Sequence, residues 1–345
     1  MALDDLPESG RFWLRFEGRG GGRRTVLVVR GAPMTRFRDA LPQLGPEVFL
    51  TDSGLETDLL FNQGVDLPQF AAFPLLRDSE GTRRLRTYFS AHAAVAKQAD
   101  VGFVFESVTW RANTDWGALL GFDAQALDEV NRMAIDLLVG VRAEFADAGH
   151  AYPISGCLGP RSDAYRPDLL MTVDAAVSYH RPQIETLADT EADLISALTL
   201  THPAEAMGIA QAARDAGMPV VLSFTVETDG KLPDGTTLAD AVRSVDDATE
   251  TYPAYYMINC AHPSHLATVL DPDATWMTRI RGIRANASSR SHAELDNATE
   301  LDSGDPVDFG RDYAEIRSRF PNLTVLGGCC GTDLRHIQQV ASACL

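Results

Sequence analysis

The sequence lacks any long apolar run and is poor in basic residues. No stretch approaches the roughly eighteen apolar residues that a membrane-spanning helix requires, and the first part of the chain lacks the apolar core of a secretory signal. Lysine and arginine number 30 against 48 aspartates and glutamates, which gives a formal net charge of −18. Such a charge disfavours binding to nucleic acid and to anionic membranes. We therefore expect a cytoplasmic protein that acts on small molecules.

Cysteine is scarce, with five residues in a chain of 345. That number is too small for the disulfide framework that holds small secreted domains together. Two of the cysteines, Cys329 and Cys330, are adjacent in the sequence. This pattern indicates catalytic or metal-binding thiols in a reducing compartment.

What the chain has in quantity is regular apolar patterning, with 45% hydrophobic and 23% charged residues. Short apolar runs alternate with longer segments of helical period, which is typical of parallel strands joined by crossover helices. The length fits one barrel of roughly 250 residues with insertions. We therefore predict an α/β protein with a single (β/α)8 TIM-type barrel. Its eight strands are expected at Val48–Thr51, Gly102–Glu106, Tyr152–Cys157, Asp193–Leu198, Pro219–Phe224, Tyr255–Asn259, Ile280–Ala285 and Leu323–Leu326.

The clearest helices are expected where apolar residues recur at intervals of three and four, from Leu85 to Ala99 and from Leu127 to Val141. The segments 227–237 and 288–308 are expected to be loop insertions. Residues 1–45 lack a sustained period, so we predict an N-terminal extension followed by one barrel domain over residues 46–345. Met34 is a candidate natural start, because the regular pattern begins soon after it.

The strongest local feature is Gly327-Gly328-Cys329-Cys330-Gly331, directly after the eighth predicted strand. Glycines on both sides let the backbone bend sharply and bring two adjacent cysteines to one point. Cys260 ends the sixth predicted strand, 69 residues before Cys329, and two β/α units of roughly 30 residues account for that separation. Active sites of these barrels gather at the carboxyl ends of the strands, so we expect the three cysteines to meet there.

Three thiolates leave one open position on a tetrahedral zinc ion, which is the arrangement of a catalytic site. The alternative is that Cys260 is a core residue and that Cys329 and Cys330 form a disulfide or fill a turn. Cys157 and Cys344 each stand alone, and we expect core packing for the first and an idle terminal thiol for the second. His262 and His265 follow Cys260 closely, but the three thiolates and a substrate already fill the tetrahedron, so they are not expected to bind zinc.

Three motifs together resemble the landmarks of the zinc-dependent homocysteine S-methyltransferase family, which includes the betaine and S-methylmethionine enzymes. They are Leu50-Thr51-Asp52-Ser53-Gly54-Leu55-Glu56-Thr57, Asn259-Cys260 and Gly327-Gly328-Cys329-Cys330-Gly331-Thr332. The resemblance implies a barrel whose catalytic zinc is bound at the C-terminal face by Cys260, Cys329 and Cys330. It also implies that homocysteine takes the fourth zinc position and is converted to methionine.

The resemblance also implies that Asp52 meets the ammonium group of an amino-acid substrate, with Ser53 and Gly54 forming the turn beside it. Ser53 departs from the family, which often has glycine there. Glu56 is expected either to contact substrate or to cap a helix. Asn259 and Asn286, each near a strand end, are expected to contact substrate, to orient a ligand or to cap a turn.

The methyl donor must carry its methyl group on a positively charged sulfur or nitrogen, or on a cofactor. S-methylmethionine, S-adenosylmethionine, betaine and a dimethylsulfonium compound are the candidates. An aromatic ring is the usual partner for such a cation. Trp110 and Trp116 follow the second strand, and either is expected to contact the donor or to pack its loop.

One departure concerns the acceptor. The family usually has a glutamate where this chain has Leu198, and that carboxylate helps to hold the amino group of homocysteine. The absence leaves open weaker homocysteine binding, another acid in its place, or methyl transfer to a different small thiol. A zinc- or redox-sensing thiol protein is the alternative from another functional class. The sequence leaves homo-oligomerisation open.

Overall fold

The computed structural model describes residues 11–14, 27–30, 35–146, 149–164, 170–266, 269–298 and 300–345. Strands β1 (Arg11–Leu14) and β2 (Leu27–Arg30) pair with each other in an antiparallel sheet. The proposed start at Met34 and most of the predicted extension lie outside the described residues. The domain boundary at residue 45 therefore stays a prediction.

The other strands form one parallel barrel, as the sequence predicts. Their order is β4-β3-β11-β10-β9-β8-β7-β6-β5, and the two strands at the ends of this order, β4 and β5, are separated in the chain by Val104 alone. Val104 also donates its N–H to the carbonyl of Leu50 at 2.9 Å, so the ring has no free edge there. The strands are β3 (Phe49–Leu50), β4 (Gly102–Phe103), β5 (Phe105–Glu106), β6 (Ile154–Leu158), β7 (Leu194–Leu200), β8 (Val220–Phe224), β9 (Tyr255–Asn259), β10 (Ile280–Ala285) and β11 (Val325–Gly328).

The differences from the predicted strands are small and have a local cause. The second predicted strand is split at Val104 because its two halves pair with different neighbours, β3 and β6. The fourth strand runs on to Leu200 and contains Thr199 with φ of 64°, where its register with β8 shifts. The eighth runs through Gly328, so the double glycine belongs to the strand and the cysteines follow it directly.

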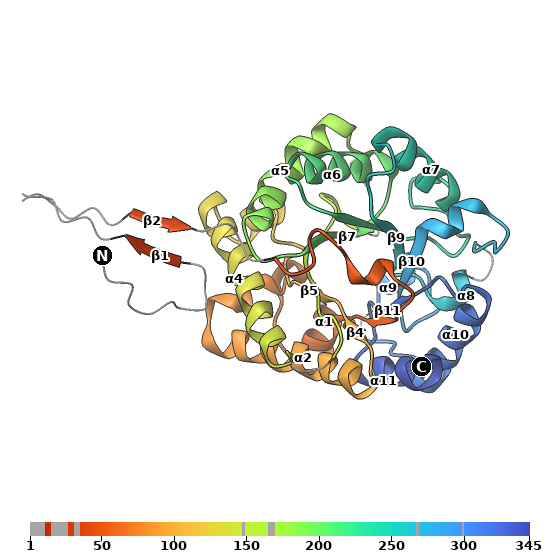
Figure 1. Ribbon diagram of the computed structural model, residues 1–345. Helices are drawn as coiled ribbons and strands as arrows, with labels where there is room; N and C mark the ends of the chain where they lie inside the picture. The colour runs from red at the N-terminus through yellow and green to blue at the C-terminus, as the bar shows by residue number, and fades with distance from the viewer. Residues whose placement is uncertain are drawn as a thin grey trace, which may run out of the picture.

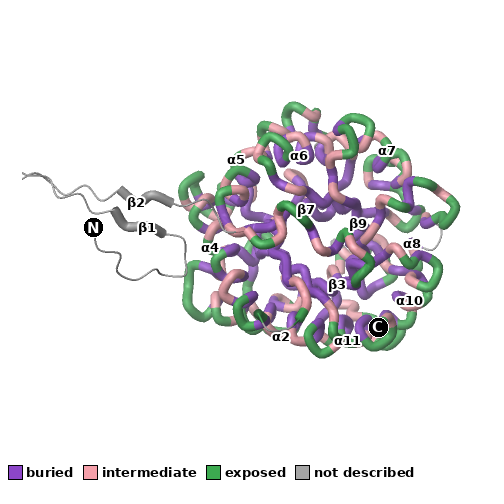
Figure 2. The backbone as a smooth tube through the Cα atoms, in the orientation of Figure 1, coloured by how far each residue is buried: buried purple, intermediate pink, exposed green. Residues whose placement is uncertain are grey.

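Helices surround the barrel on the outside (Figure 1). The two predicted helices are confirmed as α2 (Ser79–Gln98) and α4 (Ala124–Ala143), and their apolar faces are buried against the strands. Figure 2 shows the buried residues gathered in the centre and on the inner sides of the helices. The other long helices are α5 (Val173–Ala188), α6 (Pro203–Asp215), α7 (Leu238–Thr249), α10 (Pro306–Arg319) and α11 (Leu334–Cys344).

Short helices lie in the loops between these elements. They are α1 (Leu55–Thr57), α3 (Thr114–Leu119), α8 (Pro263–Leu266) and α9 (His292–Asp296), together with the π-helix η2 (Asp58–Asn62) and the 3-10 helices η1 (Pro42–Leu44), η3 (Pro68–Phe70), η4 (Phe73–Arg77) and η5 (Thr275–Arg279). Among the described residues, no helix is both long enough and apolar enough to cross a bilayer.

The described part of residues 288–308, expected as a loop insertion, is irregular except for the short helix α9 and the start of α10. Ser291 and Glu294 make a capping box that starts α9, and the carboxylate of Asp305 accepts the N–H of Val307 at the start of α10. Local capping chemistry decides this, although the segment has few apolar residues. Leu295, Ala298 and Leu301 of the same segment reach the central cavity described below.

The amino-terminal end of the barrel is closed by a buried ion pair. Arg142 donates to Oδ2 of Asp193 at 2.9 Å, and the same oxygen accepts the N–H of Ile154 at 2.9 Å. Oδ1 of Asp193 accepts the N–H groups of Arg36 and Phe37 at 2.9 and 2.8 Å. One carboxylate thus joins the segment before the first barrel strand to helix α4 and to strand β6.

Candidate metal centre and cavity

Three cysteines meet at the carboxyl ends of strands β9 and β11. Cys260 follows β9, Cys329 and Cys330 follow β11, and all three sulfur atoms lie within 4.8 Å of one another. Sγ of Cys260 and Sγ of Cys329 are joined as a disulfide, and Sγ of Cys330 lies 3.9 Å from that of Cys260. The structure thus pairs Cys329 with Cys260 across the barrel mouth and not with the adjacent Cys330.

The reduced cluster fits a metal ion bound by three thiolates. A tetrahedral site with zinc–sulfur bonds of about 2.3 Å places its sulfurs about 3.8 Å apart. The 3.9 Å between Cys260 and Cys330 matches that separation. Reduction would leave Cys329 free to move to the same distance, so the three residues can hold a metal only when they are reduced and bind it as thiolates.

The loop that carries the cysteine pair is packed tightly against the loop after β3. A Cβ atom on Gly54 would overlap the carbonyl oxygen of Cys329, so only glycine fits there. The N–H of Gly54 donates to the Thr332 hydroxyl at 3.1 Å, and the N–H of Gly331 donates to the Thr57 hydroxyl at 3.1 Å. Gly331 itself has φ of 80°, a left-handed conformation that glycine adopts without strain.

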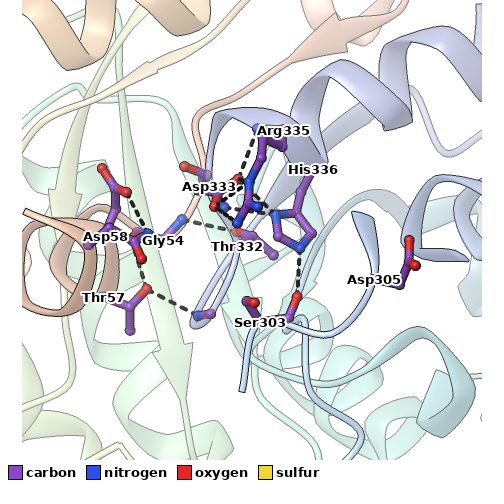
Figure 3. A network of polar contacts seen from close by, with 12 residues as sticks. Gly54, Thr57, Asp58, Ser303, Asp305, Thr332, Asp333, Arg335 and His336 are labelled. Atoms are coloured by element: carbon purple, nitrogen blue, oxygen red, sulfur yellow. Dashed lines mark hydrogen bonds and ion pairs between the residues drawn. The ribbon is translucent and has the colours of Figure 1, made fainter. Parts of the chain in front are cut away.

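A second set of contacts holds the same loop on its outer side (Figure 3). Asp333 caps α11, and Arg335 and His336 both contact its carboxylate. His336 donates from Nε2 to the carbonyl of Ser303 at 2.8 Å, which ties this capping group to the chain before α10. The cysteine pair is therefore positioned by rigid contacts on both sides.

Two asparagines named in the sequence analysis surround the cysteines. Oδ1 of Asn259 accepts the N–H of Thr199 at 2.8 Å and the Ser223 hydroxyl at 2.7 Å, and its Nδ2 lies 3.7 Å from Sγ of Cys329. Asn286 donates from Nδ2 to the carbonyl of Cys260 at 3.0 Å. Neither lines the cavity described next; Asn259 contacts the sulfur of Cys329, and Asn286 contacts the backbone of Cys260.

A cavity of about 410 Å³ opens beside the three cysteines, at the carboxyl end of the barrel. Leu198, 7% exposed, forms part of its wall, so an apolar side chain and no carboxylate stands at this point. Among the described residues, six carboxylates and two arginines line the cavity: Asp52, Glu56, Glu106, Asp163, Glu300, Asp302, Arg111 and Arg284.

Asp52 lies in the cavity wall, but its carboxylate already has partners. Arg284 approaches Oδ1 at 2.9 Å, and the Tyr88 hydroxyl donates to Oδ2 at 3.2 Å. The hydroxyl of Ser53 lies 2.8 Å from Nε2 of His92 and 3.0 Å from the Tyr88 hydroxyl. Ser53 therefore makes specific buried hydrogen bonds.

The remaining predicted contacts fall in different places. Glu56 and Trp110 both line the cavity, and burial raises the pKa of Glu56 to about 7. The Cζ atom of Arg111 lies 4.5 Å from the centre of the Trp110 ring and 3.5 Å from the centre of the Trp116 ring. Trp116 lies outside the described cavity wall, and its indole N–H donates to the carbonyl of Arg161 at 3.1 Å.

The two histidines after Cys260 make other contacts. Nδ1 of His262 lies 2.8 Å from the Ser264 hydroxyl, and Nε2 of His265 donates to the carbonyl of Ser289 at 3.0 Å. In the part of the chain that the structure describes, neither joins the cluster of candidate metal ligands. Cys344 lies in the last turn of α11, also apart from the cluster.

The sequence analysis did not predict that Glu106, Arg284 and Cys157 line the cavity. Cys157 is buried with the apolar interior, as expected, but it also lines the cavity, and burial raises the pKa of its thiol well above the ordinary value. Glu106 and Arg284 lie in predicted strands, among apolar neighbours. A charged residue at the carboxyl end of a barrel strand is the signal that could have identified Glu106.

Comparisons with known proteins agree with this geometry. A sequence model described as homocysteine S-methyltransferase matches residues 50–344. The homocysteine S-methyltransferase YbgG of Bacillus subtilis (strain 168) is 22% identical over 331 residues, which cover 90% of this chain and 97% of that protein. The homocysteine S-methyltransferase of Escherichia coli (strain K12) is 32% identical over 140 residues, which cover 35% of this chain and 44% of that protein.

Solved structures support the fold. The oxidised form of the homocysteine methyltransferase MmuM from Escherichia coli superposes with a TM-score of 0.61 at 20% identity, covering 88% of this chain and 98% of that one. The metallated form of the same protein gives a TM-score of 0.60 at 20% identity, covering 86% and 96%. These likenesses confirm the predicted barrel.

Proposed function

The chain belongs to the homocysteine S-methyltransferase family, and from that premise we propose that it methylates the thiol of homocysteine to give methionine, with zinc as its metal. The sulfur of the acceptor forms a bond to the methyl carbon as the bond from that carbon to the donor breaks. The electron pair of the broken bond stays on the donor heteroatom, which loses its positive charge. The thiol proton is released to solvent.

The observation that carries this proposal is the cluster of three cysteine sulfurs within 4.8 Å in the wall of a cavity. Cys260, Cys329 and Cys330 would hold zinc with one position open to the acceptor. Bound zinc supplies Lewis-acid chemistry, which deprotonates a coordinated thiol at neutral pH. The tight loop contacts at Gly54 and Gly331 keep the cysteine pair in place.

The charge of the cavity favours a cationic donor. Six carboxylates and two arginines line the described wall, so the local potential attracts a sulfonium or ammonium compound. Trp110 in the same wall offers an aromatic ring, and Arg111 already covers one face of it. S-methylmethionine, S-adenosylmethionine, betaine and dimethylsulfonium compounds all carry the required charge.

A different small thiol is the second candidate acceptor, and Leu198 is the observation that favours it. Its apolar side chain in the cavity wall offers no hydrogen bond to an ammonium group. Both candidates use the same three cysteines and the same cavity. They differ only in the groups that hold the rest of the acceptor.

The direct test is a methyl-transfer assay on protein purified under reducing conditions with zinc. We expect one zinc per chain and methionine formation from homocysteine with at least one of the four cationic donors, measured by mass spectrometry. Other small thiols are offered in parallel, with Cys344→Ala as a matched cysteine variant that keeps zinc and turnover. Zinc binding without methyl transfer to any thiol would instead support a sensing protein.

Asn259 provides a test of the surroundings of the metal. Asn259→Ala removes the amide that contacts the Thr199 backbone, the Ser223 hydroxyl and Cys329. Loss of such an outer contact typically lowers metal affinity by about 10- to 100-fold. We expect a decrease of that size in zinc competition titrations with a chromophoric chelator. Asn62→Ala, on the exposed η2 helix, should leave the zinc affinity as in the wild type.

A further inference from the structure

Three charged side chains are buried together in the cavity wall, although they come from different parts of the barrel. Asp52 follows β3, Glu106 ends β5 and Arg284 lies in β10, with exposed fractions of 3%, 5% and 5%. Burying charges costs free energy unless each charge finds a partner. How these three are paired therefore bears on what the cavity binds.

Arg284 is only partly used by the protein. One edge of its guanidinium approaches Oδ1 of Asp52 at 2.9 Å and donates to the carbonyl of Ser53 at 3.3 Å, and Nε donates to the carbonyl of Gly328 at 3.1 Å. Nη1 is buried and has no hydrogen-bond partner among the described residues. Asp52 is neutralised by this pairing, so it is poorly placed to hold a substrate cation as well.

Just as Arg284 has an unpaired donor in the described cavity wall, Glu106 has an unpaired acceptor. Its Oε2 is buried without a hydrogen-bond partner among the described residues, and no ion pair there joins it to Arg284. Burial raises the pKa of Glu106 to about 7, although the neighbouring Arg284 guanidinium and Ser155 hydroxyl favour its ionised form. A cation bound beside Glu106 would complete that stabilisation.

Oε2 of Glu106 and Nη1 of Arg284 are thus a buried acceptor and a buried donor without hydrogen-bond partners in the described cavity wall. Oδ1 of Asp52 and Nε of Arg111 also lack a hydrogen bond there, but the charges of these two side chains are paired with Arg284 and Asp163. Glu106 and Arg284 line the same wall as the three cysteines. A zwitterionic amino acid carries the matching pair of groups, an ammonium and a carboxylate on one carbon. A thiol without these groups would leave both protein atoms unpaired, which is a strong basis for rejecting it.

We propose that Glu106 binds the α-ammonium group and Arg284 the α-carboxylate of the acceptor, which makes Glu106 a specificity-determining residue for an amino-acid thiol. This inference rests on the proposed function. It assigns to strand β5 the carboxylate that Leu198 does not supply on strand β7.

The test compares two acceptors that differ by one group, homocysteine and 4-mercaptobutanoate, which lacks the ammonium. Zinc-loaded wild type should bind homocysteine about 10- to 100-fold more tightly in calorimetric titrations without donor, the range of a hydrogen bond to a charged group. Glu106→Gln should reduce this preference to about one by weakening homocysteine alone. The KM for homocysteine should rise in parallel, with the KM for the donor unchanged.

Matched variants make the outcome specific. Glu106→Asp keeps the charge and should keep part of the preference for homocysteine. It takes the place of Glu106→Gln in the comparison if the glutamine variant does not fold. Glu56→Gln removes another cavity carboxylate and should keep the full preference for homocysteine. The inference is overturned if Glu106→Gln weakens both acceptors equally, or if it raises only the KM for the donor. Wild type that neither binds nor methylates homocysteine would instead overturn the proposed function and this inference with it.

Discussion

Cys329→Ala is expected to reduce the zinc content of the purified protein from one ion per chain to a trace and to abolish methyl transfer. Cys329 is one of the three proposed ligands, and its sulfur contacts both Cys260 and the amide of Asn259. Removing an outer contact already costs about 10- to 100-fold in metal affinity, so losing a ligand should cost more than about 100-fold.

The measurement is zinc content by plasma emission spectrometry after exhaustive dialysis under reducing conditions, together with the methyl-transfer rate. Circular dichroism shows whether the variant still has the barrel. Cys157→Ala is the matched control for metal content, because Cys157 lines the same cavity but does not belong to the three-cysteine cluster. A folded Cys329→Ala protein that keeps one zinc ion would rule out the proposed metal centre.

Asp193→Ala is expected to produce the largest loss of stability, about 3–5 kcal/mol. The carboxylate of Asp193 is fully buried and accepts hydrogen bonds from Arg142 and from the N–H groups of Arg36, Phe37 and Ile154. Its removal leaves the guanidinium of Arg142, whose side chain is 3% exposed, with only the partly exposed carboxylate of Glu191 at 3.6 Å as an ion-pair partner. Three backbone N–H groups lose their acceptor at the same time.

Thermal and urea unfolding followed by circular dichroism test this expectation. A loss of this size should lower the Tm by about 4–7 °C in a chain of this length. Asp189→Ala is the control, because Asp189 also pairs with an arginine, Arg132, but its side chain is 54% exposed. An exposed pair contributes at most about 1 kcal/mol. Equal shifts in the two variants would contradict the structural role given to Asp193.

The contrast between Asp193 and Asp52 shows how two buried aspartate–arginine pairs serve different purposes. The Asp193 pair at the amino-terminal end of the barrel uses both carboxylate oxygens within the protein. The Asp52 pair at the carboxyl end leaves Nη1 of Arg284 without a partner in the described wall of the cavity. The first pair closes the fold, and the second offers a hydrogen bond to a ligand.

Much of the fold follows from the sequence. Tyr255–Asn259 and Ile280–Ala285 have the predicted bounds. The first is a fully buried, mostly apolar run of the kind typical of parallel strands, and the second keeps its isoleucines and its alanine buried although it also contains two arginines. The split at Val104 and the bend at Thr199 could not be predicted, since each depends on which neighbouring strand pairs with the backbone. Register between strands is a property of the assembled sheet.

The candidate site divides in the same way. The sequence by itself determined that Cys260, Cys329 and Cys330 meet at one end of the barrel. The glycines beside the two adjacent cysteines and the separation of 69 residues from Cys260 can both be read directly from the chain. The tertiary structure alone decided that Asp52 is paired with Arg284, that Asn259 and Asn286 support the cysteines, and that Glu106 faces the same cavity. The physical reason is that a charged side chain in the cavity wall is available to a ligand only if its buried neighbours leave it unpaired. Those neighbours come from strands that are far apart in the chain.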